Sequence, residues 1–189
     1  MKKLSKHLHK LSTGRMTLAT LVIFILFMIL VLPGQAQQAD ASAESEAGSP
    51  DLSFFYTPAD LYKMAEAYGE AGRAAYIRAR FTFDLVWPLV YAAFLATSMS
   101  WLFSRAFHPK SRWQWVNLAP FWGMIFDFLE NISTSWVMAR YPNRTPVIAF
   151  LAPWFTLVKW VLVGGSFLLL VVGIIAAVWK WGQKRMSLN

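Results

Sequence analysis

The chain has no cysteine among its 189 residues, and only 15% of its residues are charged. Without cysteine it cannot contain a disulfide, a thiolate zinc site, an iron–sulfur cluster or a cysteine nucleophile. Soluble domains carry about 25% charged residues, so the low charge argues against an ordinary cytoplasmic enzyme. P-loop, dinucleotide-binding, GxSxG and HExxH motifs are also missing from the sequence. These absences leave the common soluble enzyme classes without support.

Long apolar segments dominate the chain instead. A membrane-spanning helix needs about 20 apolar residues to cross a hydrocarbon layer about 30 Å thick. Four segments approach or exceed that length, at residues 17–33, about 81–103, about 116–138 and about 147–181. The last is too long for one perpendicular span, so it must tilt, kink at Pro153 or begin along the membrane surface. We therefore predict an all-α, polytopic membrane protein with four transmembrane helices, three of them within residues 81–181.

Basic residues show how this bundle is oriented. The net charge is +8, and the basic residues of the arm at 1–16, of the loop between the second and third segments and of the tail at 182–189 have no acid among them. Positively charged loops stay in the cytoplasm, so we expect both termini to be cytoplasmic in a bacterial inner (plasma) membrane. The basic residues are interpreted as topology signals that contact membrane lipids, and no nucleic-acid partner is expected.

The first apolar segment has a second interpretation. A basic start, a short apolar run and Ala41-Ser42-Ala43 downstream resemble a secretory signal peptide with its cleavage site. The basic region is long for a signal peptide, however, and the small-residue motif lies well beyond the apolar run. We favour an uncleaved helix over residues 17–33.

The predicted outer loop has two parts. Residues 34–50 consist mainly of Gln, Ala, Ser and Glu and contain no large apolar side chain. We therefore predict a disordered linker there. Residues 51–80 are rich in aromatic side chains, and Thr57-Pro58-Ala59-Asp60 predicts the start of a short interfacial helix that ends before Gly69. Its apolar stripe should lie on the membrane surface or against the mouth of the bundle. A second helix should continue from about Ala71 into the membrane.

Ionisable side chains inside the apolar segments mark the candidate site. Asp127, Glu130 and Asn131 stand at i, i+3 and i+4 and so share one helix face. Counted from Trp136 at the predicted outer boundary, Asp127 is roughly 13 Å deep and Glu130 roughly 9 Å. A buried charge costs about 2.5 to 3.5 kcal/mol at mid-membrane and is by default a candidate for function. We therefore place the site in the outer half of the bilayer.

Neighbouring segments supply further candidates. The second apolar segment contributes an aspartate and a tyrosine, and the fourth contributes a lysine. The outer loop contributes arginines that need local partners. The complete predicted site consists of Arg73, Arg80, Asp84, Tyr91, Asp127, Glu130, Asn131 and Lys159. Carboxylates this close cannot all ionise cheaply, so at least one should be protonated or paired with Lys159 or Arg80. The histidines lie in basic stretches without carboxylates, so we expect no metal and no cofactor.

These polar residues have three interpretations that the sequence leaves open. They can act as hydrogen-bonding contacts between helices, as a pocket for a ligand or substrate, or as a path for protons or ions. Lys159 can also extend its side chain to the membrane surface. In the fourth segment, Gly164-Gly165 predicts a close helix contact.

Several motifs resemble those of known membrane proteins. YTPADLY, GEAGRAAY, FDLVWPLVYAAF and FDFLEN, between Tyr56 and Asn131, are similar to a group of small uncharacterised bacterial membrane proteins with four helices. The second helix, with its acid, aromatic residues, proline and tyrosine, also resembles that of the emopamil-binding and sigma-2-receptor-like proteins. Those proteins are also short helical bundles with intramembrane acids around a sterol-type pocket, but the acid of their first helix is absent here.

Three functions follow as hypotheses. The first is an integral membrane protein, without enzyme activity, that binds a lipid, a small amphiphile, a partner protein or a second copy of itself at an outer-facing polar pocket. The second is a membrane-embedded enzyme that modifies a lipid and uses an intramembrane carboxylate as acid or base. The third is a small proton-coupled carrier, although carriers commonly contain internal repeats and this sequence shows none.

Overall fold

The computed structural model describes residues 2–34 and 48–186, and within these ranges the chain is helical without strands. Most of the expected linker at residues 34–50 lies outside them. The helices are α1 (Lys2–Leu11), α2 (Gly14–Leu30), α5 (Pro58–Ala67), α6 (Gly69–Arg80), α7 (Phe83–Ala106), the 3-10 helix η1 (Arg112–Leu118), α8 (Ala119–Arg140) and α9 (Pro146–Met186).

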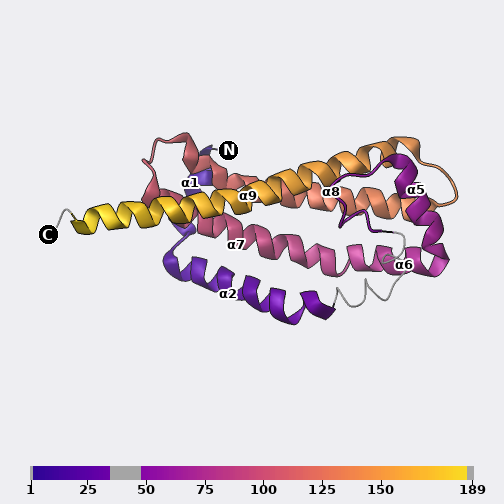
Figure 1. Ribbon diagram of the computed structural model, residues 1–189, viewed down its shortest axis with the longest axis horizontal. Helices are drawn as coiled ribbons and strands as arrows, with labels where there is room; N and C mark the ends of the chain where they lie inside the picture. The colour runs from indigo at the N-terminus through magenta and orange to yellow at the C-terminus, as the bar shows by residue number, and fades with distance from the viewer. Residues whose placement is uncertain (1, 35–47, 187–189) are drawn as a thin grey trace.

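The long helices lie roughly along one axis (Figure 1). α9 runs almost the full length of the molecule beside α8 and α7, and α2 lies against α7. We call the end that holds α1, η1 and the last turns of α9 the terminal end. The opposite end, which holds α5 and α6, is the loop end. Both chain termini lie toward the terminal end, so the basic arm and the basic tail lie in the same half of the molecule.

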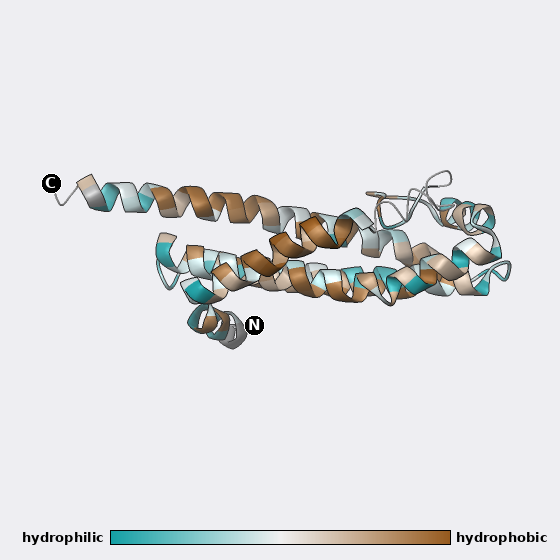
Figure 2. Cartoon of the chain, turned by 90° about the horizontal axis from the view of Figure 1, so that it is seen from below, coloured by the Kyte–Doolittle hydropathy of each residue, from teal (hydrophilic) through white to brown (hydrophobic). Residues whose placement is uncertain are grey.

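Three helical stretches are long and apolar enough to cross a membrane: Gly14–Gly34, Gly69–Ala106 and Pro146–Lys184. Figure 2 shows apolar residues along α2 and much of α9, with hydrophilic residues collected at the loop end and around α1. This is the distribution of a multi-pass membrane protein. α8, the third span expected from the sequence, is not one of the three stretches.

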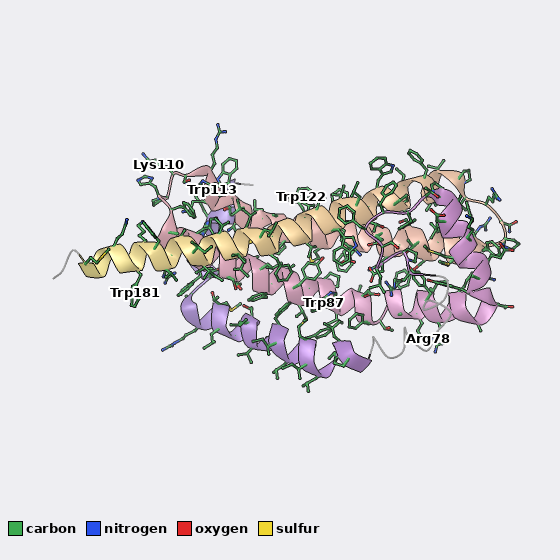
Figure 3. All side chains as sticks on the ribbon, in the orientation of Figure 1. Arg78, Trp87, Lys110, Trp113, Trp122 and Trp181 are labelled. Carbon is green, nitrogen blue, oxygen red and sulfur yellow. The ribbon has the colours of Figure 1, made fainter. Side chains whose placement is uncertain are left out.

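Aromatic and threonine side chains join α2 to α7. The hydroxyl oxygens of Thr20 and Thr97 lie 2.7 Å apart, which satisfies two polar groups within an apolar interface. Further toward the loop end, Phe24 stacks on Phe94 with 4.5 Å between the ring centroids. Trp87 lies between the two helices (Figure 3) and stacks on α2. The end of α2 is therefore level with the start of α7.

The fourth expected segment forms one continuous helix, α9, of 41 residues. At about 1.5 Å per residue it is roughly 60 Å long, about twice the thickness of the hydrocarbon layer. The helix continues through Pro153. Close helix contacts occur at two other glycines than expected: a Cβ atom on Gly173 would lie 2.6 Å from Phe103, and one on Gly123 would lie 2.9 Å from Val163.

The prediction for Gly164-Gly165 is wrong, because a Cβ atom on either glycine would meet nothing within 4 Å. The two residues lie on a part of α9 that faces no neighbouring helix closely enough to need a glycine. The glycine pair in the sequence thus does not show which face of the helix approaches its neighbours.

The aromatic loop segment folds as α5 followed directly by α6. Thr57 and Asp60 form a reciprocal capping box around Pro58, which fixes where α5 begins. Gly69 takes the left-handed conformation, with φ of 61°, at the junction between the helices. The apolar stripe of α5, including Leu61, packs against α8 and α9. Of the two positions expected for this stripe, it therefore takes the one against the mouth of the bundle.

The last residues of the expected linker are packed. Ser49 and Pro50 are buried, and the Tyr68 hydroxyl donates a 2.6 Å hydrogen bond to the carbonyl oxygen of Gly48. Tyr68, between α5 and α6, therefore holds Gly48 in place, and the composition of the linker did not predict this contact.

At the terminal end, the basic arm forms helix α1, which is anchored by polar contacts. Both ring nitrogens of His9 lie next to carbonyl oxygens, that of Ser100 at 2.9 Å and that of Gln114 at 2.8 Å. The Ser5 hydroxyl donates to Asn117 Oδ1 at 2.9 Å, and Asn117 in turn donates to the Ser100 hydroxyl. The arm is therefore joined to α7 and η1 through buried side chains.

Candidate functional site

Six charged side chains meet between the loop end and the middle of the molecule. Five stretches of chain supply them: α6, α7, α8, α9 and the covering segment, which we define as residues 48–57. We call this group the charge cluster: Asp51, Arg80, Asp84, Asp127, Glu130 and Lys159. Every member except Asp51 is buried.

Lys159 lies at the centre of the cluster. Its ammonium nitrogen is 2.5 Å from Glu130 Oε2 and 2.6 Å from Asp51 Oδ1. The other carboxylate oxygen of Glu130 accepts a 2.8 Å hydrogen bond from the hydroxyl of Thr156, one turn from Lys159 on the same face of α9. Glu130 has no solvent exposure. These contacts give a fully buried carboxylate one cation and one hydrogen-bond donor.

Arg80 forms a second centre at the end of α6. Its Nε lies 2.8 Å from Asp84 Oδ2, and its Nη1 lies 3.1 Å from Asp51 Oδ2. The guanidinium group also lies over the ring of Tyr76, 4.6 Å from the centroid, which is favourable for a cation. Arg80 and Lys159 therefore bind the two oxygens of one carboxylate, that of Asp51.

Asp127 is held by neutral groups. The Tyr91 hydroxyl donates to its Oδ2 at 3.0 Å, and the Asn131 amide donates to its Oδ1 at 3.3 Å. Asn131 also points to the backbone carbonyl of Asp84, at 3.4 Å. Asp127 forms no ion pair with any residue that the structure describes. The cluster therefore contains four carboxylates and two cationic groups.

Three of the carboxylates have the spacing of a cation site. One oxygen each from Asp51, Asp127 and Glu130 lie within 4.8 Å of one another, an arrangement of hard oxygen ligands that suits Mg²⁺ or Ca²⁺. The Lys159 ammonium, however, is within 2.6 Å of two of these residues. It supplies the positive charge between them, and a metal ion would have to displace it.

Asp51 remains ionised because of its two cationic partners. Burial raises the pKa of the Asp51 carboxyl, but the positive charges of Lys159 and Arg80 and their hydrogen bonds outweigh it and hold the pKa well below the ordinary 3.8. Asp51 is therefore a carboxylate throughout the physiological pH range. Its side chain is 25% exposed, whereas those of Arg80 and Lys159 are 8% and 5% exposed.

The structure brings most of the predicted site together. Arg80 and Asp84, Tyr91 and Asp127, and Glu130 and Lys159 each form direct contacts, and Asn131 bridges two of the acids. Arg73 is the exception and does not reach the cluster.

Arg73 lies at the loop end instead. Its guanidinium donates to the carbonyl oxygen of Ala65 at 2.9 Å and lies 4.9 Å from the centroid of the Tyr141 ring. It is seven residues before Arg80, which places it about 10 Å farther along α6. Arg73 therefore contacts residues near the junction of α5 and α6 and lies outside the charge cluster.

Sequence reasoning missed two members of the site. Asp51 lies in an irregular segment, where no periodicity shows the direction of a side chain. Thr156 could have been found, because it stands three residues before Lys159 and therefore shares its helix face.

A separate hollow lies at the terminal end, between the last turn of α7 and α9. Its volume is about 560 Å³. The lining residues are Ala106, Val172, Ile175, Ala176, Trp179, Lys180 and Gln183. It is open and mostly apolar, and it has none of the buried ion pairs of the charge cluster.

Comparison with known proteins adds no assignment to these observations: no family model, no curated protein and no solved structure matches the chain.

Proposed function

We propose that this is a bacterial inner-membrane protein with four transmembrane helices that binds a lipid or small amphiphile at the charge cluster. In this arrangement α2, α7, α8 and α9 cross the membrane, with the terminal end in the cytoplasm and the loop end outside. The basic residues at the terminal end support this orientation. Lys110 and Trp113 lie at the same end as Trp181, as expected for one membrane boundary (Figure 3).

The end of α2 indicates where the outer boundary passes. Phe27 lies in the last turn of α2 and stacks on Phe83, the first residue of α7, with 5.7 Å between centroids. Asp84 follows directly, and Arg80 lies less than one turn before Phe83. The charge cluster is therefore expected at the outer edge of the hydrocarbon layer, where a lipid head group would lie.

The observation that supports binding most strongly is the convergence of six charged side chains, five of them buried, from five parts of the chain. Buried ion pairs contribute little net stability compared with well-packed apolar residues, and ionisable groups inside membranes commonly mark functional sites. Asp127, which forms no ion pair with a described residue, adds a fourth carboxylate to a cluster that contains two cations. The Tyr91–Asp127 hydrogen bond joins α7 to α8, but contact between helices does not require four carboxylates around two cations.

The surroundings of the cluster favour an amphiphile as its ligand. The covering segment contains Asp51 next to exposed apolar side chains, including Leu52 and Phe54, which are 74% and 61% exposed. Phe55 contacts Trp154 of α9 edge-to-face at 5.7 Å. Charged and exposed apolar groups thus lie side by side, and a ligand with a polar head and an apolar body matches both.

Lipidomic analysis of the gently solubilised protein tests this proposal. The double variant Glu130→Gln/Lys159→Met removes the central ion pair without leaving an unpaired buried charge. The double variant Glu66→Gln/Lys63→Met makes the same changes on the exposed surface of α5 and is the matched control. We expect an amphiphile to be retained by the parent and the control and lost from the cluster variant. Equal retention by all three proteins contradicts binding at the cluster.

One observation favours a lipid-modifying enzyme as a second candidate. The Tyr91–Asp127 hydrogen bond pairs a carboxylate with a phenol that can pass on a proton, which is an arrangement suited to acid–base chemistry. Incubation of the parent with the retained lipid should then give a product, and Asp127→Asn should abolish turnover while the protein stays folded. If Asp127→Asn changes stability alone, the enzyme hypothesis fails.

A further inference from the structure

Asp51 occupies a position that resembles a binding site for an external anion. Its two carboxylate oxygens bind two different cations, Lys159 at 2.6 Å and Arg80 at 3.1 Å. The cations come from α9 and α6, and both are almost completely buried, whereas Asp51 comes from the partly exposed covering segment. A carboxylate or phosphate group presents its oxygens to basic side chains in the same way.

Both cations keep another acidic partner if Asp51 leaves. Lys159 retains Glu130 at 2.5 Å, and Arg80 retains Asp84 at 2.8 Å. A buried charge left without any partner is strongly destabilising, and this arrangement avoids that penalty. Asp51 itself would move into water, where a carboxylate is well solvated. The contact between the covering segment and the two cations can therefore open without orphaning a charge.

The covering segment is attached on both sides of Asp51. The carbonyl oxygen of Gly48 accepts the hydrogen bond from Tyr68, and Tyr56 is buried, where its hydroxyl contacts Thr156 at 3.2 Å. Between these anchors, Leu52 and Phe54 project into the surroundings. A small movement of the residues between the anchors is enough to withdraw the Asp51 carboxylate.

We propose that Asp51 is an internal substitute for the head group of an anionic amphiphile, which displaces it from Arg80 and Lys159. The inference rests on the proposed function and specifies its ligand: a molecule with one carboxylate or phosphate group and an apolar chain. The exchange replaces one negative charge by another, so the charge of the cluster stays the same. The apolar chain lies along the exposed side chains of the covering segment and Trp154. Removal of Asp51 therefore strengthens binding, because it removes a competitor.

Oleate binding to the purified full-length protein in nanodiscs tests the exchange. Radiolabelled oleate reports affinity, and a polarity-sensitive dye on Leu52→Cys, the single cysteine of that variant, reports movement of the covering segment. Oleyl alcohol supplies the chain without the charge, whereas acetate and inorganic phosphate supply the charge without the chain. We expect oleate to bind and shift the dye signal, and the other three compounds to do neither at the same concentration.

Charge-neutral variants provide the decisive comparison. Asp51→Asn should bind oleate roughly tenfold more tightly, since oleate no longer competes with an internal carboxylate for the two cations. Arg80→Gln should bind it at least tenfold more weakly, and Glu66→Gln, a change of an exposed acid on α5, should match the parent. Unchanged or weaker oleate binding by Asp51→Asn overturns the proposal that Asp51 takes the place of a head group. Equal binding of oleyl alcohol and oleate overturns it as well.

The outcomes also separate the two proposals. Displacement of oleate by acetate or phosphate at equal concentration overturns the proposal that the ligand is an amphiphile. It identifies the cluster as a site for small anions. If oleyl alcohol binds at the cluster and depends on the Glu130–Lys159 pair, the proposed function stands and only the role of Asp51 is wrong. If none of these compounds binds to any variant and no lipid is retained after purification, the proposed function itself fails.

Discussion

At the scale of single residues, Lys159 is a buried cation whose position depends on its acidic neighbours. Its ammonium group is buried between two carboxylates and replaces the cation that three converging acids would otherwise attract. Glu130 depends on this lysine, since without it the carboxylate would be an uncompensated charge in an apolar environment, whereas Lys159 keeps Asp51 as a partner if Glu130 is removed. A coupled loss of stability should follow when one of them is removed.

Lys159→Met should destabilise the protein by about 3–5 kcal/mol, because it leaves Glu130 buried without a cation. Adding Glu130→Gln should recover much of that loss. Unfolding in mixed micelles with increasing denaturing detergent measures both variants. Lys63→Met, at a side chain that is 79% exposed, should change stability by less than about 0.5 kcal/mol. Additive losses in the double variant would show that the two residues are not coupled.

Asp51 should make stability depend on pH. Its folded-state pKa lies below the ordinary 3.8, so its ion pairs are fully formed above about pH 4 and are lost as the pH falls toward the folded-state value. Near pH 7 the parent should be more stable than Asp51→Asn by about 1.5–3 kcal/mol, and the difference should shrink in acid. Thermal unfolding of both proteins between pH 7 and pH 3 measures this. A difference that does not change with pH contradicts the assignment.

At the scale of helices, close packing of α7 on α9 depends on Gly173. A Cβ atom there would lie 2.6 Å from the ring of Phe103, which is fully buried and in contact with Phe107 and therefore has little room to move. Gly164 on the same helix has open space around its Cα atom. The two glycines thus allow identical substitutions with opposite consequences.

Gly173→Ala should destabilise the protein by about 1–3 kcal/mol through overpacking. Gly164→Ala should be neutral or stabilise it by up to about 1 kcal/mol, since alanine is the better helix former. Detergent unfolding of the two variants side by side provides the measurement. Equal stability of the two variants would show that α7 and α9 are farther apart than the structure places them.

Local sequence signals predicted the helices that they define. Thr57, Pro58 and Asp60 determine the start of α5 through contacts within four residues, and the spacing of Asp127 and Glu130 determines a shared face on any helix. The side chains that join α1 to the bundle could not be predicted in this way. Ser5 contacts Asn117, 112 residues away, and no local pattern in the basic arm shows that partner.

The same distinction applies to the site. Acids within apolar helices are conspicuous in a sequence, so Asp84 and Glu130 were found. Asp51 lies in irregular chain, and its direction depends on cations from α6 and α9. Arg73 and Arg80 share a helix, but only the position of each along α6 decides which one reaches the cluster.

At the scale of the whole molecule, the proposed topology places the loop between α8 and α9 on the non-cytoplasmic side of the membrane. The chain has no cysteine, so single cysteines can be added without removing any. Asn143→Cys in this loop should react with a membrane-impermeant maleimide on intact spheroplasts, whereas Lys110→Cys and Gln183→Cys should react only after permeabilisation. Labelling of Asn143→Cys and Lys110→Cys from the same side would show that α8 does not cross the membrane.

Photo-crosslinking in native membranes tests directly whether an anionic amphiphile binds at the charge cluster. A fatty acid with a diazirine in its chain is activated on the intact protein, and mass spectrometry locates the modified residues. We expect crosslinks on the covering segment and on residues 154–159 of α9, which excess oleate suppresses and Arg80→Gln removes. Crosslinks confined to α2 and to the hollow at the terminal end, and insensitive to oleate, would contradict it.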